Sequence, residues 1–327
     1  MSTNRYYRGP ASDHFDGTRF FNPDYPSTDR GLRDVLKWKF GGKPDRWEPA
    51  PRTRQVVPQP SVQGLRVTLV GHASVLVQAA GRNYLFDPVW SERVSPLRFA
   101  GPRRFNPPAM TLEQLPRIDA VFVSHNHYDH LDMRTLQWMW RKFKPAIVAP
   151  LGNDAVIRRS DRRIAVTTLD WHEGTLLDDE TQVFVVPANH WSNRWLGDRR
   201  MALWGGFYLK TAAGSVYFAG DTGYGDGRVF REIRERYGDP DVALLPIGAY
   251  APRWFMQAQH VDPREAVQIA RDCGAGQSLG LHWGTFRLTD ESAQAPQLAL
   301  ETALDEAGMP RQRFLPMQPG DVWSVAK

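Results

Sequence analysis

Short apolar runs separated by turn-forming residues make up most of the chain after residue 64. Leu65–Val70 and Ser74–Gln78 are rich in β-branched residues, and Gly81-Arg82-Asn83 is typical of a turn into Tyr84–Phe86. This pattern predicts a meander that opens one sheet. Further strands are predicted at Asp119–Ser124, Ala146–Ala149, Ile164–Leu169, Gln182–Val186, Leu203–Leu209, Ser215–Ala219, Val242–Pro246 and Ser278–Leu281.

Helical periodicity appears between several of these runs. Leu131–Phe143 carries apolar residues at helical spacing, with Asp132 near its start and basic residues near its end. A second helix is predicted from Asp262-Pro263-Arg264-Glu265, where Asp262 caps, Pro263 takes the first turn and Glu265 closes a capping box. Meanders followed by strands that alternate with helices predict an α/β fold with two sheets face to face and helices outside.

The first 63 residues lack this regularity. They contain Pro, Gly, Asp and Arg without sustained periodicity, which predicts an extended arm wrapped over a domain. We therefore expect residues 1–63 to form an N-terminal arm and residues 64–327 to form one catalytic domain.

Composition narrows the chemistry. The chain has 327 residues, 42% of them hydrophobic, which is enough for a substantial core, and its single cysteine excludes an intrachain disulfide or a cysteine metal cluster. Any metal must then be bound by His, Asp or Glu. Met1–Pro10 lacks the apolar run of a signal peptide, and the longest apolar stretch is interrupted by Gly71 and His72, so we expect a cytoplasmic protein.

The net charge gives a weaker indication of a binding partner. A net charge of +5 favours anionic partners only slightly, but the chain has 12 tryptophans, and two stretches mix some of them with cations. These stretches are Trp38–Trp47 and Trp191–Arg200. Such mixtures suit peripheral contact with an anionic membrane surface, whereas packing in the core or in loops is the alternative use.

The strongest local signal is Ser124-His125-Asn126-His127-Tyr128-Asp129-His130, directly after a predicted strand. It places four potential ligands within six positions. In a turning loop, His125 and His127 can point to one spot while Asp129 and His130 point to a neighbouring one, so one segment could serve two metals. The alternative is a polar surface loop with chance histidines, which the concentration of three of the nine histidines here argues against.

Single ligand-type residues follow three other predicted strands. His190 comes after Gln182–Val186, Asp221 after Ser215–Ala219, and His282 after Ser278–Leu281. Each could be a residue of the core or of a turn. Their shared position at strand ends makes them candidates to complete two metal shells.

In its order HxHxDH, His, Asp, His, the chain resembles the metallo-β-lactamase superfamily, whose fold is a four-layer αβ/βα sandwich. Within it, the chain is similar to the N-acyl-phosphatidylethanolamine-hydrolysing phospholipase D family, over about Leu65 to Phe286. The motifs that carry this resemblance are 71–74, 87–88, 101–105, 118–132, 246–256, 259–263 and 282–286.

The resemblance implies a dinuclear zinc site and hydrolysis of a phosphodiester. His125, His127 and His190 would hold one ion, Asp129, His130 and His282 the other, and Asp221 would bridge them. A shared carboxylate offsets the repulsion between two close cations, and the ions would supply an activated water and withdraw charge from a phosphate. Zinc suits the histidine-rich shell, although iron or manganese could use the same ligands.

Other residues are assigned supporting roles. His260 resembles a family position that reaches the substrate, so we expect Asp129, Asp221 and His260 to take part directly in catalysis, His260 by binding the phosphate or assisting the leaving alkoxide. Its alternative is a surface histidine. His72 and Asp87 are predicted to support the ligands from outside the metal shells. His14 and His172 are expected to be structural.

Several alternatives stay open from the sequence. The leading expectation is phospholipase-D-type hydrolysis of N-acyl-phosphatidylethanolamine or a similar phospholipid to N-acylethanolamine and phosphatidic acid, by a homodimer as in relatives. A sugar-phosphate lactonase of the same fold and a non-catalytic metal-binding scaffold are the alternatives. No concentrated basic strip supports a nuclease, so no nucleic-acid partner is expected.

Overall fold

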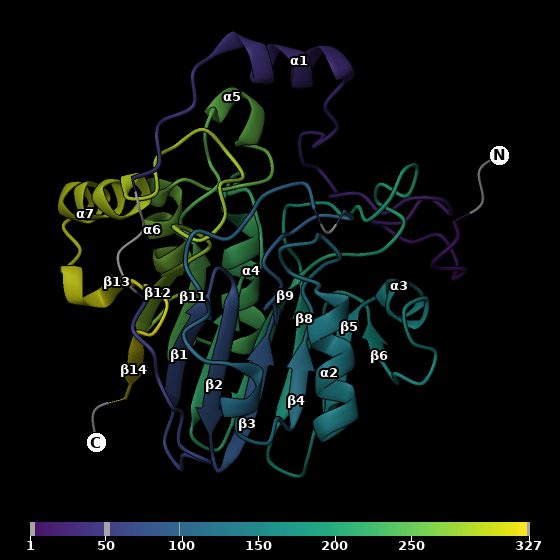
Figure 1. The fold of residues 1–327 in the computed structure, drawn as a ribbon, viewed down its shortest axis with the longest axis vertical. Helices are drawn as coiled ribbons and strands as arrows, with labels where there is room; N and C mark the ends of the chain where they lie inside the picture. The colour runs from purple at the N-terminus through teal and green to yellow at the C-terminus, as the bar shows by residue number, and fades with distance from the viewer. Residues whose placement is uncertain (1–3, 49–52, 98, 326–327) are drawn as a thin grey trace.

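Two seven-stranded sheets lie face to face in the computed structural model, which describes residues 4–48, 53–97 and 99–325 (Figure 1). The first sheet has the order β14-β1-β2-β3-β4-β5-β6. Its pairs are antiparallel from β14 to β3 and parallel from β3 to β6. Its strands are β1 (Arg66–Gly71), β2 (Ser74–Ala79), β3 (Arg82–Phe86), β4 (Ala120–Phe122), β5 (Ala146–Pro150), β6 (Thr167–Leu169) and β14 (Val322–Ser324).

The second sheet has the order β13-β12-β11-β10-β9-β8-β7. The pairs from β10 to β13 are parallel and those from β7 to β10 are antiparallel, so both sheets are mixed. Its strands are β7 (Gly174–Leu176), β8 (Gln182–Val186), β9 (Gly206–Thr211), β10 (Gly214–Phe218), β11 (Val242–Pro246), β12 (Gln277–Leu281) and β13 (Phe314–Pro316).

Helices cover the outer face of each sheet. α2 packs on the first sheet through Leu136 and Met139, and α4 and α6 pack on the second through residues such as Phe230 and Ile269. The inner faces meet in a separate core of alternating residues from both sheets. The helices are α1 (Leu32–Gly41), α2 (Met133–Phe143), α3 (Asn153–Arg158), α4 (Arg228–Tyr237), α5 (Arg253–Met256), α6 (Pro263–Asp272) and α7 (Ala295–Ala307), with 3-10 turns at Leu112–Gln114 and Arg311–Arg313.

This arrangement confirms the predicted α/β four-layer sandwich. The two predicted helices also form, and Asp262 and Glu265 make the predicted capping box at the start of α6. α2 begins at Met133 because Asp132 is its N-cap and accepts a hydrogen bond from the amide of Arg134 at 3.1 Å.

Two predicted strands are placed wrongly in part. β6 covers only Thr167–Leu169 of the predicted Ile164–Leu169. Leu203–Leu209 was expected, but β9 runs from Gly206 to Thr211. Leu203 and Trp204 are buried against Phe15 and Phe20 of the arm and so lie outside the sheet. A contact between segments this far apart in the sequence leaves no local signal.

The prediction of a wholly extended arm is wrong for residues 32–41, which form α1. The aspartate in its first turn, Asp34, accepts a hydrogen bond from the Gly31 amide at 3.0 Å and thereby supports the helix start. Apolar residues do recur here at helical spacing, but the segment is short and Gly-flanked. α1 lies beyond the end of the sandwich, next to α5 (Figure 1).

The rest of the arm is fastened to the domain by buried contacts. The His14 imidazole lies 2.7 Å from the Asp170 carboxylate and stacks on Trp171 with 4.5 Å between ring centroids. His172 lies elsewhere on the same turn, with Nδ1 3.2 Å from the Tyr237 hydroxyl.

The boundary between the arm and the catalytic domain at residue 63 remains a prediction. Among the described residues, no helix is both long enough and apolar enough to cross a membrane.

Candidate metal centre

Loops from both sheets bring the candidate ligands to one end of the sandwich. His125 follows β4 in the first sheet, whereas His190, Asp221 and His282 follow β8, β10 and β12 in the second. Because each strand is buried and paired in register, the residues that follow it are held in fixed positions. All seven predicted ligands converge there in two groups.

The first group consists of His125, His127 and His190. Nε2 of His125 lies 2.9 Å from Nδ1 of His127, which in turn lies 3.2 Å from Nε2 of His190. Nitrogens bound to one zinc ion at about 2.0–2.1 Å in a tetrahedron lie roughly 3.3 Å apart. The three nitrogens therefore have the spacing of ligands on one ion.

The second group consists of Asp129, His130 and His282. Nε2 of His130 lies 3.1 Å from Nε2 of His282 and 3.5 Å from Oδ2 of Asp129, and the distance from His282 Nε2 to the same oxygen is 3.3 Å. These atoms have a similar spacing to those of the first group.

Asp221 lies between the two groups. Its Oδ2 is 3.8 Å from Nε2 of His125 in the first group and 3.2 Å from Nε2 of His130 in the second. Its Oδ1 is 3.2 Å from Nε2 of His282. One carboxylate therefore borders both ligand sets, as a bridging ligand must.

Asp87 and Ser124 hold one histidine of each group. The Asp87 carboxylate lies 2.6 Å from Nδ1 of His130 and accepts hydrogen bonds from the Ser124 hydroxyl at 2.6 Å and amide at 2.7 Å. The same hydroxyl lies 2.9 Å from Nδ1 of His125. Such partners fix the ring orientation and tautomer of a ligating histidine. Asp87 thus lies where the sequence predicted it, while the link through Ser124 was not foreseen.

Two further contacts orient His190 and Asp129. Nδ1 of His190 lies 2.9 Å from the carbonyl oxygen of Gln259, a backbone contact that no side-chain pattern reveals. His72 lies at the turn between β1 and β2, and its Nε2 is 3.1 Å from Oδ2 of Asp129. His72 therefore contacts a candidate ligand, as predicted, and is close enough to the second group to offer a further nitrogen.

Three buried residues of this centre have a left-handed backbone. φ is +56° at His72, +41° at Asp87 and +65° at His282. Such conformations are costly for residues with a side chain and tend to persist at functional sites, where the surrounding structure enforces them. The turns after β1, β3 and β12 are thereby aimed at the ligand groups.

The electrostatics separate neutral imidazoles from ionised carboxylates. Burial lowers the pKa of His127 and His190 to about 3 and that of His125 well below its usual value. Burial opposes the charge on Asp129 and Asp221, but the surrounding imidazoles, above all His130, hold the pKa of both carboxyls well below the usual range. Neutral imidazoles and ionised carboxylates are the forms that bind metal.

The ionised carboxylates of the centre favour positive charge beside them. Burial lowers the pKa of a histidine, yet Asp221 and its neighbours outweigh burial and hold the pKa of His130 well above its usual value. They likewise raise the pKa of His282 to about 9. Oδ1 of Asp221 is buried without a hydrogen-bond partner among the described residues. The donor set, its spacing and its charge therefore fit divalent cations.

His260 lies beside the centre, before α6. Its Nδ1 is 3.9 Å from Oδ2 of Asp221, and this nitrogen is buried without a partner among the described residues. Burial lowers the pKa of His260 to about 3. The residue can join Asp221 and His282 in a third possible ligand group, so its exclusion from the metal shells remains a prediction.

A pocket of about 310 Å³ opens over the centre and reaches His127, Asp129, Asp221 and His260. Part of its wall comes from the arm. The arm residues are Thr28, Arg30, Val35 and Trp38, and the apolar residues of the domain are Trp191, Phe255, Met256 and Leu288. The sequence did not place these arm residues beside the ligands, because the two segments lie far apart along the chain.

Hydrogen bonds and ion pairs hold the arm next to this pocket. The Arg199 guanidinium donates to the Asp29 carboxylate at 2.8 Å and to the Thr28 carbonyl at 2.7 Å, and Arg200 donates to the same carboxylate at 2.9 Å. Arg199 also stacks over Trp191 at 3.6 Å, and the Trp191 ring packs edge-on against His127 with 4.5 Å between centroids. The arm is thus connected to a candidate ligand through two side chains.

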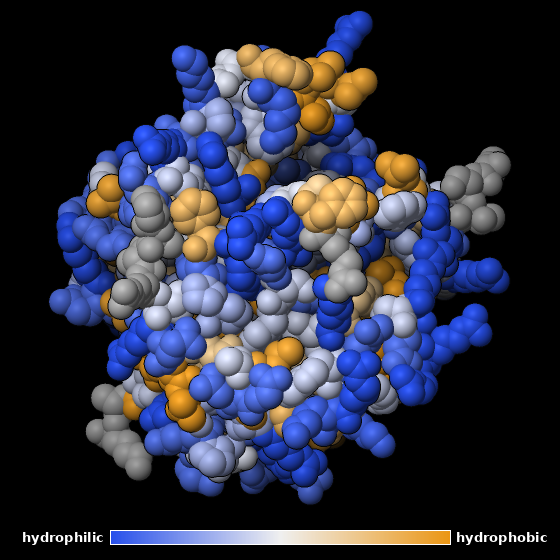
Figure 2. All heavy atoms as spheres, in the orientation of Figure 1, coloured by the Kyte–Doolittle hydropathy of each residue, from blue (hydrophilic) through white to orange (hydrophobic). Residues whose placement is uncertain are grey.

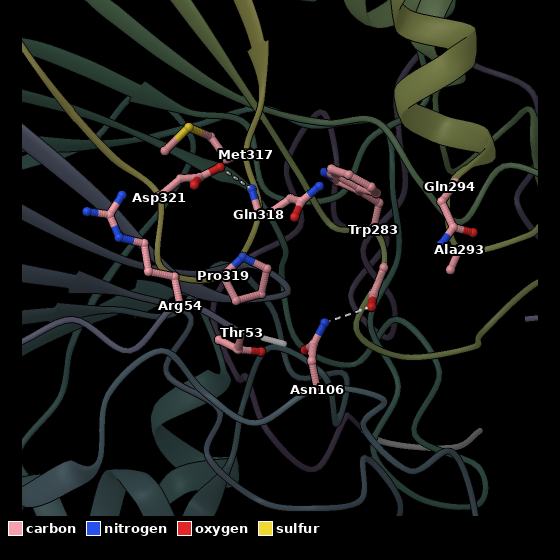
Figure 3. Close-up of a pocket in the computed structure, with 11 residues that line it drawn as sticks. Thr53, Arg54, Asn106, Trp283, Ala293, Gln294, Met317, Gln318, Pro319 and Asp321 are labelled. Carbon is pink, nitrogen blue, oxygen red and sulfur yellow. Dashed lines mark hydrogen bonds between the residues drawn. The ribbon is translucent and has the colours of Figure 1, made fainter. Parts of the chain in front are cut away.

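A second, smaller cavity of about 100 Å³ lies behind the His282 turn (Figure 3). Trp283 lines it on one side, with Gln318 and Pro319 on another, and Asn106 donates a hydrogen bond to the carbonyl of Gly284 at 2.9 Å. None of the candidate ligands lines this cavity. Its walls support the His282 turn from outside the centre.

Comparison with known proteins agrees with this geometry. Residues 82–283 match the family described as the β-lactamase superfamily domain. N-acyl-phosphatidylethanolamine-hydrolyzing phospholipase D 1 of Caenorhabditis elegans is 37% identical over 277 residues, which cover 81% of this chain and 77% of that protein. An uncharacterised protein of Mycobacterium tuberculosis is 34% identical over 96% of this chain and 85% of its own.

Solved structures show the same fold at lower identity. The isothiocyanate hydrolase from Delia radicum gut bacteria superposes with a TM-score of 0.62 at 19% identity. The superposition covers 80% of this chain and 100% of that one. At that identity the likeness establishes the fold alone.

Proposed function

The chain belongs to the β-lactamase superfamily, as a metal-dependent hydrolase similar to N-acyl-phosphatidylethanolamine-hydrolysing phospholipase D, and from this premise we propose that it is a phospholipid phosphodiesterase. Its substrate is N-acyl-phosphatidylethanolamine or a similar phospholipid, and its products are an N-acylethanolamine and phosphatidic acid. The proposal includes two zinc ions, a homodimer and a cytoplasmic location with peripheral contact to an anionic membrane.

The observation that carries the proposal is the position of Asp221, which borders both ligand groups with distances of 3.2 Å on one side and 3.8 Å on the other. Two divalent ions, when bound by these groups, would supply an activated water and neutralise a phosphodiester during attack. His125, His127 and His190 would hold one ion and Asp129, His130 and His282 the other, with Asp221 shared.

The chain's own residues provide the rest of the reaction. Asp87 and Ser124 keep the rings of His130 and His125 in place, so the ligand atoms need no rearrangement during turnover. His260 lines the pocket, and its Nδ1 is buried without a hydrogen-bond partner among the described residues, so it can hydrogen-bond a phosphate oxygen or the departing alkoxide oxygen. The apolar walls exclude water from the region around the phosphate.

The second candidate function is a sugar-phosphate lactonase, for which the same ligand set would serve. Trp38, Phe255, Met256 and Leu288 in the pocket wall argue against it, because a sugar phosphate is polar on all sides. A non-catalytic scaffold is disfavoured by the presence of all seven ligands in one centre.

The first experiment is to identify products. Metal-loaded protein is incubated with N-acyl-phosphatidylethanolamine and, separately, with a sugar-phosphate lactone, and the products are separated by mass spectrometry. The proposal expects phosphatidic acid and N-acylethanolamine from the first substrate, and no turnover after chelation. Opening of the lactone with the phospholipid left intact favours the second candidate, and no turnover of either substrate favours the scaffold.

A further inference from the structure

α1 presents an exposed apolar stripe. Leu32, Leu36 and Phe40 recur at every fourth position of this helix, so they lie on one side of it, and their exposed fractions are 75%, 46% and 83%. α1 projects beyond the sandwich (Figure 1), and orange apolar atoms gather at this end of the molecule (Figure 2). An exposed apolar patch rimmed by polar residues is typical of an interaction site.

The inward side of the same helix belongs to the pocket. Val35 and Trp38 line the pocket that contains His127 and Asp221. The Trp38 indole donates a hydrogen bond to Asp290 at 2.8 Å and packs on Phe255 with 4.8 Å between ring centroids. A surface that bound the outward stripe of α1 would therefore lie next to the entrance of the pocket.

The charge around the stripe is strongly positive. Residues 30–43 carry five cations and one acid, namely Arg30, Arg33, Lys37, Lys39 and Lys43 against Asp34. Two of these cations lie over indole rings, Lys39 over Trp38 at 3.9 Å and Lys37 over Trp254 at 4.6 Å, and Trp254 is itself 43% exposed. Cations beside exposed aromatic and aliphatic residues favour the interface of an anionic bilayer over a neutral apolar partner.

The size of the pocket supports the same occupant. At about 310 Å³ it lies at the lower end of the range for ligands of drug size, roughly 300–1,000 Å³. A phospholipid with several long acyl chains is larger than such a ligand. The pocket can hold the phosphate and its nearest groups, while the chains must remain outside it, in an apolar environment.

We propose that α1 docks on an anionic lipid bilayer, with Leu32, Leu36 and Phe40 in the interface and the surrounding cations at the headgroups. The phosphate of a bilayer lipid then enters the pocket past Val35 and Trp38, while its acyl chains stay in the membrane. This assigns the proposed membrane contact to one helix. The delivery of substrate rests on the proposed phosphodiesterase activity, whereas the docking of α1 does not.

Vesicle flotation tests the docking without reference to catalysis. The probes are vesicles of phosphatidylcholine alone and of phosphatidylcholine mixed with phosphatidylglycerol. The wild type should float with the mixed vesicles, and added salt should weaken this binding. The double variant Leu32→Glu/Phe40→Glu should lose about tenfold or more of the bound fraction, because it puts acids where apolar side chains enter the interface. The matched control is Leu298→Glu on α7, where the native side chain is 62% exposed, and it should bind like the wild type.

Each outcome bears on the proposal. Absence of wild-type flotation with the mixed vesicles, or equal flotation of the double variant, would overturn it. Equal binding to both kinds of vesicle would overturn the role of the cations. A second measurement compares hydrolysis of vesicle lipid with hydrolysis of a water-soluble phosphodiester: the double variant should lose only the former. If the wild type floats but cleaves neither substrate, the proposed function fails and the docking stands.

Discussion

The two sides of the pocket are built in different ways. On the domain side, ligands follow buried strands of two sheets, and several of them are held by a second residue, as Asp87 holds His130. On the arm side, the wall consists of Thr28 and Arg30 before α1 and of the half-buried Val35 and Trp38 on it, beside an ion pair between Asp29 and Arg199, both partly exposed to solvent. Geometry is therefore fixed firmly where the chemistry occurs and weakly where the substrate enters.

This difference indicates which function each side of the pocket can serve. Removing one member of a buried network of charges and imidazoles is strongly destabilising, because the partners of that member stay buried and unpaired. An exposed ion pair contributes little to stability, so we expect its loss mainly to change the position of the arm. We expect changes on the domain side to affect metal and rate, and changes on the arm side to affect substrate binding.

The largest effect is expected from Asp221→Ala. Wild-type protein should hold about two metal ions, and the variant should lose at least one of them and nearly all activity, more than the roughly 100-fold typical of losing an outer partner. Elemental analysis beside turnover of a soluble phosphodiester measures both. A wild type with one tightly held ion that survives the substitution would contradict the bridging role.

The next effect is that of His260→Ala. Both metals should remain while kcat falls about a hundredfold, the scale of a positioned hydrogen-bonding or proton-transfer group. Metal content decides how the result is read. Loss of an ion would place His260 in a metal shell, and an unchanged rate would make it a structural residue.

A smaller effect is expected from Asp87→Asn. The carboxylate accepts hydrogen bonds from Ser124 and from His130 through both of its oxygens, and an amide offers a single acceptor oxygen. Metal affinity should fall about 10- to 100-fold in a competition with a chelator. The control is Asp241→Asn: among the described residues this carboxylate accepts hydrogen bonds only from Ser215, at 2.7 and 2.9 Å, and its loss should leave metal affinity unchanged. Equal effects of the two substitutions would refute a specific role for Asp87.

The smallest effect is expected on the arm side, from Asp29→Ala. Removing the partner of Arg199 and Arg200 should raise KM by up to about fivefold, the value of an exposed ion pair, with kcat and metal content retained. Asp24→Ala, which removes an arm acid paired with Arg228 at 3.6 Å, serves as the control and should leave KM unchanged. A fall in kcat with an unchanged KM would erase the contrast between the two sides.

The same contrast explains what the sequence could predict. Most strands and the grouping of His125 to His130 were visible because apolar runs and ligand spacing are local features. β7, β13 and β14 were missed because each has only three residues and gains its stability from pairing at a sheet edge.

Contacts between distant segments were invisible for the same reason. Asn22 donates a hydrogen bond to the carbonyl of His190 from 168 positions away, and no periodicity relates the two. The Gln259 carbonyl that orients His190 is a backbone group, so any residue type could provide it. α1 was missed because a ten-residue helix flanked by glycine is a weak signal, although its apolar spacing was present.

The most direct test of the central claim is the fate of oxygen-18 during cleavage of N-acyl-phosphatidylethanolamine in labelled water. If water adds to phosphorus and the bond from phosphorus to the leaving oxygen breaks, the label must appear in phosphatidic acid, and the released N-acylethanolamine must keep its original oxygen. Mass spectrometry of the two products reads this directly. Label found only in a new carboxylate, with no phosphatidic acid formed, would contradict the phosphodiesterase assignment while leaving the metal centre intact.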